Sequence, residues 1–237
     1  MQAALLPTEL PKRLKGVDVA VRFAPARELG GDLYDFLAPE SHSLVVAVGD
    51  VSGKGLPAAL YSAFAGELVR SRTFRRRYAP ERFSPAGVLA SMNTILHERQ
   101  LEEYYCTLCY AVFDTKRRTL TLANSGLPYP IRWSGGSVSQ IELPGIPLGA
   151  FVGSTYDEIT FDLTVGDVYV FCSDGVFEAN DALGREFGTA RVLALLNETR
   201  QQTAQEIVDA MFMAVQGFRG NTPPSDDMTA VAVKITG

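Results

Sequence analysis

Residues 107–123 read TLCYAVFDTKRRTLTLA, two runs of aliphatic, aromatic and β-branched residues around a short polar connection. Such runs indicate β-strands, and the polar connection between them indicates a hairpin. Further runs of this kind follow without a helical pattern between them, joined by segments that contain Gly, Pro, Asn and Ser. The predicted strands are 107–114, 119–123, 131–133, 137–143, 156–163 and 167–172. We therefore expect antiparallel hairpins and meanders across the middle of the chain.

Helical patterns flank this β-rich part in pairs, because apolar residues recur there at spacings of three and four. The predicted helices are about 56–78, about 85–104, 191–196 and 204–218. Further strands are predicted at 17–24, 43–48 and 228–235. Since strands mostly follow strands instead of alternating with helices, the pattern favours an α+β fold, a layered sandwich with helices packed outside antiparallel sheets.

Composition limits the classes of function. The chain has 237 residues, of which 46% are hydrophobic and 21% charged, which fits one globular domain with a large core. Its net charge of -5 argues against a nucleic-acid binder that works through a broadly basic surface. No stretch is apolar enough for a membrane-spanning helix, and the first ten residues lack the features of a signal peptide. We therefore expect a cytoplasmic protein with neither nucleic acid nor membrane as a partner.

Cys106 and Cys109 form a Cys-x-x-Cys pair, which raises the alternatives of a redox centre and a zinc site. A redox pair needs its first thiol at a helix N-terminus, whereas these residues lie in a predicted strand and should point to opposite faces. A zinc site needs further soft ligands, and Cys172, His42 and His97 are isolated in the sequence. A structural role for both cysteines is the favoured interpretation.

Aspartates recur beside glycine or at the ends of predicted strands. They are Asp32, Asp50, Asp174 and the pair Asp226-Asp227. Any one of them could be an ordinary turn residue. Carboxylates brought together from these four places in the chain, however, would repel one another unless cations neutralised them. Because these ligands are all oxygen and lack a nearby His or Cys, the pattern favours a site for Mg²⁺ or Mn²⁺.

Two basic features have open interpretations. The loop 49–55, GDVSGKG, lacks the spacing of a Walker phosphate loop, so Lys54 either meets a phosphate or is a solvated turn residue. The arginines between Arg70 and Arg82 most simply complement the dipole at a helix C-terminus, and a docking patch for an acidic partner is the alternative.

Several blocks together resemble the metal-dependent PPM-type protein serine/threonine phosphatases, in the SpoIIE/RsbU-like bacterial branch. The blocks are 30–36 (GGDLYDF), 49–55 (GDVSGKG), 123–128 (ANSGLP), 145–149 (GIPLG), 173–176 (SDGV) and 226–229 (DDMT). The resemblance implies a four-layer α-β-β-α sandwich of two antiparallel sheets flanked by helices. It also implies a catalytic domain over residues 16–237, with residues 1–15 as the remnant of a linker helix or an N-terminal extension.

The resemblance further implies a site with two Mn²⁺ or Mg²⁺ ions. Asp32 and Asp50 would be the core ligands, with Asp50 bridging both ions and the Val51 carbonyl adding an oxygen. Asp174 and Asp226 would complete one ion's ligands. Asp227 would support the ligands without binding an ion itself, and Asp35 would at most assist them.

The implied reaction is hydrolysis of phosphoserine or phosphothreonine by a water that two metal ions activate. Arg27 would bind the phosphate. Ser52 stands where distant relatives carry a histidine suspected as the general acid, so the proton donor to the leaving group is open. A metal-dependent nuclease or phosphodiesterase is a weaker alternative, which the acidic composition opposes.

The implied substrate is a phosphorylated STAS-type anti-sigma-factor antagonist in a partner-switching pathway, and a homodimer through an N-terminal linker helix is possible in this branch. A catalytically silent PPM-fold module that only binds a partner is the main alternative. Its mark would be the loss of a metal aspartate, and all of them are present.

Overall fold

Two five-stranded antiparallel sheets pack face to face in a computed structural model of the chain, which describes residues 6–7, 15–75, 84–99 and 104–237. One sheet has the order β1 (Val17–Ala24), β10 (Met228–Ile235), β9 (Val168–Cys172), β6 (Ile131–Ser134) and β7 (Ser137–Gln140). The other has the order β2 (Leu33–Glu40), β3 (Ser43–Val51), β4 (Cys106–Asp114), β5 (Thr119–Asn124) and β8 (Glu158–Asp162).

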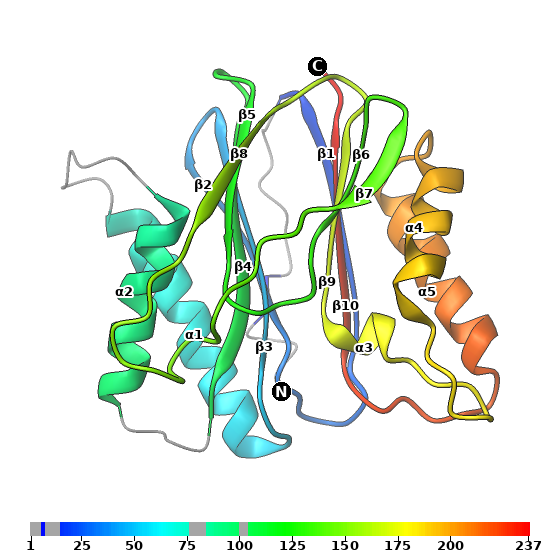
Figure 1. The fold of residues 1–237 in the computed structure, drawn as a ribbon, viewed down its shortest axis with the longest axis horizontal. Coiled ribbons are helices and arrows are strands. Elements are labelled where there is room, and N and C mark those ends of the chain that lie inside the picture. Colours follow the sequence, from blue (N-terminus) through cyan, green and yellow to red (C-terminus); the bar gives the residue numbers. More distant parts are fainter. Residues whose placement is uncertain (1–5, 8–14, 76–83, 100–103) are drawn as a thin grey trace.

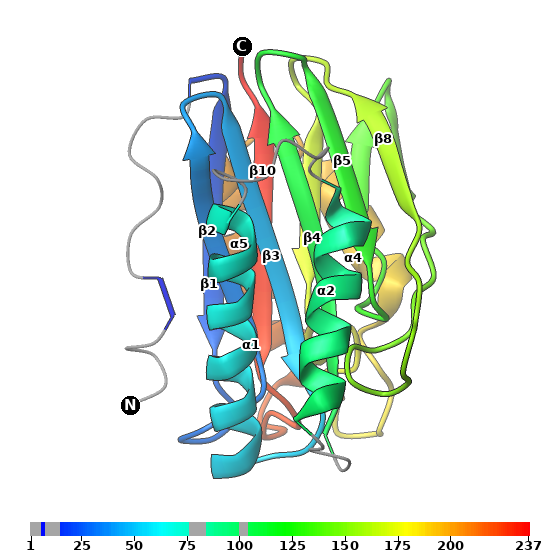
Figure 2. The same cartoon turned by 90° about the vertical axis from the view of Figure 1, so that its left-hand side faces the viewer.

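Helices cover the outer face of each sheet. The second sheet is covered by α1 (Leu56–Arg75) and α2 (Pro85–Glu98), which lie side by side in Figure 2. The first is covered by α4 (Gly188–Thr199) and α5 (Ala204–Arg219), with the short α3 (Asp174–Phe177) at its lower edge in Figure 1. The expected four-layer α-β-β-α sandwich is confirmed.

The core follows from strand alternation, because successive side chains point to opposite faces of a sheet. On β4, Leu108 and Tyr110 pack under α1 and α2, while Ala111 and Phe113 lie between the sheets. The ring of Phe113 meets that of Phe171, from the other sheet, edge to face with centroids 6.4 Å apart. Both faces of the central strands are therefore buried, which explains their continuous apolar sequence.

The cysteines belong to this core. Cys106 packs in the helix-facing cluster and Cys109 in the cluster between the sheets, so the two thiols point to opposite faces as expected. All three cysteines are free and buried, and burial raises the pKa of each thiol. Because the thiolate is the reactive and metal-binding form, this environment supports the structural interpretation.

Several element boundaries differ from the sequence-based expectation. β2 was not expected as a strand, and α3 was not expected as a helix. β3 extends to Val51, so Asp50 lies on a strand that pairs with Thr107 instead of in a loop. α2 ends at Glu98, and the predicted end of α1 near Tyr78 lies outside the described residues. Within the described ranges, no helix has the length and apolarity that crossing a membrane requires.

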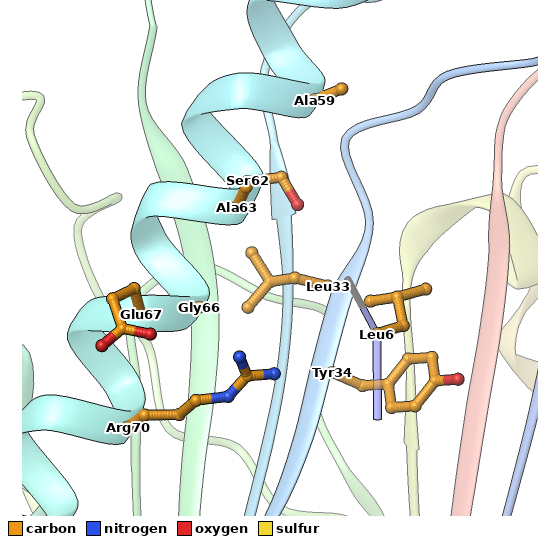
Figure 3. A pocket seen from close by; sticks show the side chains of 9 residues that line it. All are labelled: Leu6, Leu33, Tyr34, Ala59, Ser62, Ala63, Gly66, Glu67 and Arg70. Atoms are coloured by element: carbon orange, nitrogen blue, oxygen red, sulfur yellow. The ribbon is translucent and has the colours of Figure 1, made fainter. Parts of the chain in front are cut away.

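A cavity of about 150 Å³ lies between α1 and the edge strand β2. Figure 3 shows Leu6 beside Leu33 and Tyr34, opposite the small residues Ala63 and Gly66 of α1. Leu6 is buried there, so at least this N-terminal residue packs on the domain. None of the aspartates that the sequence singled out lines this cavity.

Candidate functional site

The four aspartates come from both sheets and gather at one end of the sandwich. Asp32 precedes β2 and Asp50 lies near the end of β3, both in the sheet under α1. Asp174 begins α3 two residues after the end of β9, and Asp226 lies two residues before β10; both strands belong to the opposite sheet. Figure 1 shows the end of β3, the start of β10 and α3 together at the lower edge. The fold therefore brings together residues that are far apart in sequence.

Asp32 is the most enclosed of the four, with 1% of its surface exposed. Its Oδ2 accepts hydrogen bonds from Ser173 Oγ at 2.8 Å and from Thr229 Oγ1 at 2.5 Å, both from the opposite sheet. Burial raises the pKa of Asp32 to about 7; the two hydroxyls lower it, and the charges of Asp227 and Asp174 raise it. The Asp32 carboxyl group is thus held in place where water cannot easily solvate its charge.

Asp50 is partly buried among other carboxylates. Burial and the negative charges of Asp32, Asp174 and Asp226 raise its pKa to about 8. The backbone around it is closely packed: a Cβ on Gly31 would lie 2.5 Å from Asp50 Oδ1 and 2.4 Å from the Val51 carbonyl oxygen. Only glycine lets the segment that carries Asp32 approach Asp50 and Val51 this closely.

Asp174 and Asp226 face more solvent. Burial and the charge of Asp226 raise the pKa of Asp174, while the charge of Lys54 opposes that rise. Asp226 Oδ2 pairs with Lys54 Nζ at 3.0 Å, and its side chain is 41% exposed. These two carboxylates therefore form the open side of the site.

Asp227 fixes the backbone around the site. It is 3% exposed and accepts a hydrogen bond from the Ala26 N–H at 2.8 Å, which ties the β1–β2 connection to the start of β10. A Cβ on Gly30 would lie 1.4 Å from Asp227 Oδ2, and one on Gly175 would lie 2.0 Å from the Asp227 carbonyl oxygen. The glycines in both motifs thus permit close contact with Asp227.

The remaining predicted residues are exposed or have other partners. Arg27 is exposed in the β1–β2 connection, and no described contact joins it to the four aspartates. Ser52 Oγ accepts a hydrogen bond from the Tyr105 N–H at 3.0 Å. Asp35 pairs with Arg70 of α1 at 2.6 Å, on the helix-facing side of β2.

Ser173 and Thr229 were not anticipated as site residues. Ser173 directly precedes the predicted ligand Asp174 and Thr229 lies three residues after Asp226, but hydroxyl residues are common at such positions. Their role depends on the antiparallel pairing of β9 with β10, in which Cys172 lies opposite Ala230. That register brings both hydroxyls to Asp32.

The donor set fits hard divalent cations, because it consists of carboxylates that raise one another's pKa and could add the Val51 carbonyl. As they stand, however, no three or more His, Cys, Asp or Glu side chains within the described ranges form a compact metal-binding group. The carboxylates are thus near one another without converging on one point.

Comparison with known sequences decides the family. The sequence model described as Stage II sporulation protein E (SpoIIE) matches residues 40–236, which include Asp50, Asp174 and Asp226. The chain belongs to the SpoIIE family. It is a phosphatase domain of the PP2C type, a class of metal-dependent enzymes.

Known relatives within and around the SpoIIE family agree with this assignment. The phosphoserine phosphatase RsbU of Bacillus subtilis (strain 168) is 27% identical over 99% of this chain and 68% of its own length. The SiaA-PP2C domain of Pseudomonas aeruginosa has a TM-score of 0.83 at 21% identity, over 99% of this chain and 92% of that one. The PP2C phosphatase domain of Bacillus subtilis SpoIIE, solved with a fragment of its regulatory domain, has a TM-score of 0.80 at 21% identity. That match covers 94% of this chain and 64% of the solved one.

Proposed function

We propose that this domain removes phosphate from phosphoserine or phosphothreonine of a protein, using two Mn²⁺ or Mg²⁺ ions. Asp32, Asp50, the Val51 carbonyl, Asp174 and Asp226 would hold the ions. The observation that carries the proposal is the coupled set of carboxylates that two sheets bring to one edge, with pKa values of about 7 for Asp32 and about 8 for Asp50.

Divalent cations, when bound, neutralise phosphoryl charge and acidify water. The chain's own residues then have separate tasks. Ser173 and Thr229 fix the orientation of Asp32 through their hydroxyl groups. Gly31 keeps Asp50 and the Val51 carbonyl close to the segment that carries Asp32. Arg27 stays a predicted phosphate ligand, which would have to turn toward the site from its exposed position.

The substrate proposal rests on similarity. The name of the relative RsbU supports phosphoserine as the group removed. By the same resemblance, the substrate is a phosphorylated STAS-type anti-sigma-factor antagonist in a cytoplasmic partner-switching pathway. We further propose that residues 16–237 form the catalytic domain and that residues 1–15 belong to an extension or linker helix through which two copies could pair.

The test is hydrolysis of para-nitrophenyl phosphate and of a phosphoserine protein with Mn²⁺, with Mg²⁺ and with chelator, in wild type and in Asp174→Asn. We expect metal-dependent turnover that the substitution lowers by about 100-fold or more, because a proposed metal ligand loses the negative charge that holds the cation. Asp162→Asn is the matched control, since Asp162 is exposed on β8 and is not one of the proposed ligands.

Three other outcomes would each count against the proposal. Full turnover in Asp174→Asn would exclude the assigned ligand set. Calorimetric metal binding without turnover on either substrate would favour the catalytically silent binding module. Hydrolysis of a nucleic acid but not of a phosphoprotein would favour a nuclease.

A further inference from the structure

Lys54 lies on the short loop between β3, which carries Asp50 and Val51, and the first turn of α1. Its neighbours Gly53 and Gly55 have φ values of +87° and +79°, a backbone conformation that L residues with side chains rarely adopt. The two glycines therefore shape a tight loop whose single long side chain stands at the edge of the carboxylate site.

The ammonium group of Lys54 contacts the site directly. Nζ donates a hydrogen bond to the Ser225 carbonyl at 2.9 Å and pairs with Asp226 Oδ2 at 3.0 Å. Its charge also acts on Asp174. Burial and the charge of Asp226 raise the pKa of Asp174, whereas the charge of Lys54 lowers it. Among the ion pairs of the described residues, this is the one that involves a proposed metal ligand.

These contacts are weakly held. The side chains of Lys54 and Asp226 are 46% and 41% exposed, and ion pairs at such positions are screened by water. The long stem of lysine can turn without moving the backbone. Lys54 is thus a positive charge that can move within the mouth of the site, unlike the buried Asp32 and its fixed hydroxyl partners.

The charges indicate where Lys54 would go. The formal charges of four carboxylates and two divalent cations sum to zero. A phosphomonoester adds a charge of about -1.5 to -2 at neutral pH. A cation on Asp226 would also remove most of the attraction between that carboxylate and the ammonium group. A phosphate oxygen at this end of the sandwich would then be the strongest acceptor available to Lys54.

We propose that Lys54 is a substrate-binding residue, whose ammonium group leaves Asp226 when a divalent cation takes that carboxylate and then contacts a phosphate oxygen of the substrate. This rests on the proposed phosphatase function and adds a residue to it. The competing explanation is structural: Lys54 would only fasten the segment before β10 to the loop before α1.

Lys54→Met and Lys54→Arg separate the two explanations, with the exposed Lys116 in the β4–β5 turn changed to Met as the matched control. The measurements are KM and kcat for para-nitrophenyl phosphate at saturating Mn²⁺, inhibition by inorganic phosphate, and calorimetric Mn²⁺ binding without substrate. We expect Lys54→Met to raise both KM and the phosphate inhibition constant about tenfold, the effect of one charge-assisted hydrogen bond. Lys54→Arg should stay within about threefold of wild type, because it keeps the charge.

The affinity for Mn²⁺ distinguishes the two explanations, because a structural role of Lys54 would change it in a different direction. Under the proposal, Lys54→Met binds Mn²⁺ as tightly as wild type or more tightly, because a competing cation has left Asp226. Weaker Mn²⁺ binding with unchanged KM and phosphate inhibition would overturn the proposal and support the structural explanation. If wild type shows no turnover, the phosphatase function fails, and calorimetric binding of phosphate to the Mn²⁺-loaded domain decides the role of Lys54. Equal phosphate affinity in wild type and Lys54→Met would then exclude Lys54 as a substrate-binding residue.

Discussion

Asp32→Asn is expected to stabilise the metal-free domain at pH 8. Asp32 is almost completely buried, and burial raises its pKa to about 7 even though hydroxyls of Thr229 and Ser173 donate to it. In the unfolded chain the same carboxyl group titrates near 3.8. At pH 8 folding therefore confines a charge that the unfolded chain exposes to water, and asparagine removes that charge while keeping the shape of the side chain.

The sign and size follow from proton linkage. The folded state binds the Asp32 proton more tightly than the unfolded state, so its contribution to stability is complete below about pH 4 and is lost as the pH rises through about 7. At 1.36 kcal/mol per pH unit, the difference between 3.8 and about 7 corresponds to about 4 kcal/mol, of which about 2 kcal/mol falls between pH 5.5 and pH 8. Asp50, with a pKa of about 8, acts in the same direction.

The assay is urea unfolding in the presence of chelator near pH 5.5 and near pH 8, for wild type, Asp32→Asn and the surface control Asp162→Asn. Wild type should be the less stable at the higher pH, and Asp32→Asn should exceed it there by about 2 to 4 kcal/mol. Added Mn²⁺ should stabilise wild type far more than Asp32→Asn, because ligand binding stabilises only the state that binds. The reasoning is refuted if Asp32→Asn is less stable than wild type at pH 8 with chelator, or if metal-free wild type gains stability between the two pH values.

Two further predictions concern packing around the site. Gly175→Ala should cost about 1 to 3 kcal/mol in urea unfolding, because its Cβ would lie 2.0 Å from the Asp227 carbonyl oxygen. Gly217→Ala on α5, where nothing lies within 4 Å, should instead add roughly 0.5 to 1 kcal/mol, and equal effects would contradict this account. Cys106 and Cys109 should react with a thiol reagent only as fast as the domain unfolds, so rapid labelling of the native protein would count against their burial.

The sequence predicts the layered architecture because the central strands carry their signal locally. β4 and β9 are continuous apolar runs that need burial on both faces, and the helices beside them show a regular apolar spacing. The aspartates are predictable for a similar reason, since Asp50 and Asp174 follow apolar runs beside glycine, Asp32 follows a Gly-Gly pair, and Asp226 precedes the last apolar run. Local composition therefore identifies both the layers and the edge at which a cation site could form.

β2 shows where local composition fails. Residues 33–40 contain Pro39 and two acidic residues, which argue against a strand. Asp35 is nevertheless buried at 3% exposure, because Arg70 of α1 supplies a neutralising partner at 2.6 Å. A partner that distant in sequence cannot be read from the strand itself. The hydroxyls of Ser173 and Thr229 were missed for the same reason, as their contact with Asp32 depends on the register between β9 and β10.

The division of the site between two sheets links its chemistry to the stability of the fold. Asp32 and Asp50 lie on or next to strands of one sheet, whereas Asp174, Asp226 and the hydroxyl donors lie on or close to strands of the other. Packing between the sheets holds these carboxylates near one another, and burial together with their mutual repulsion raises their pKa values. The free energy of packing in the core therefore offsets the repulsion between the carboxylates. A bound cation would reduce that repulsion and stabilise the folded domain. Substitutions that loosen the contact between the sheets, even far from the aspartates, should for this reason weaken metal binding before they unfold the domain.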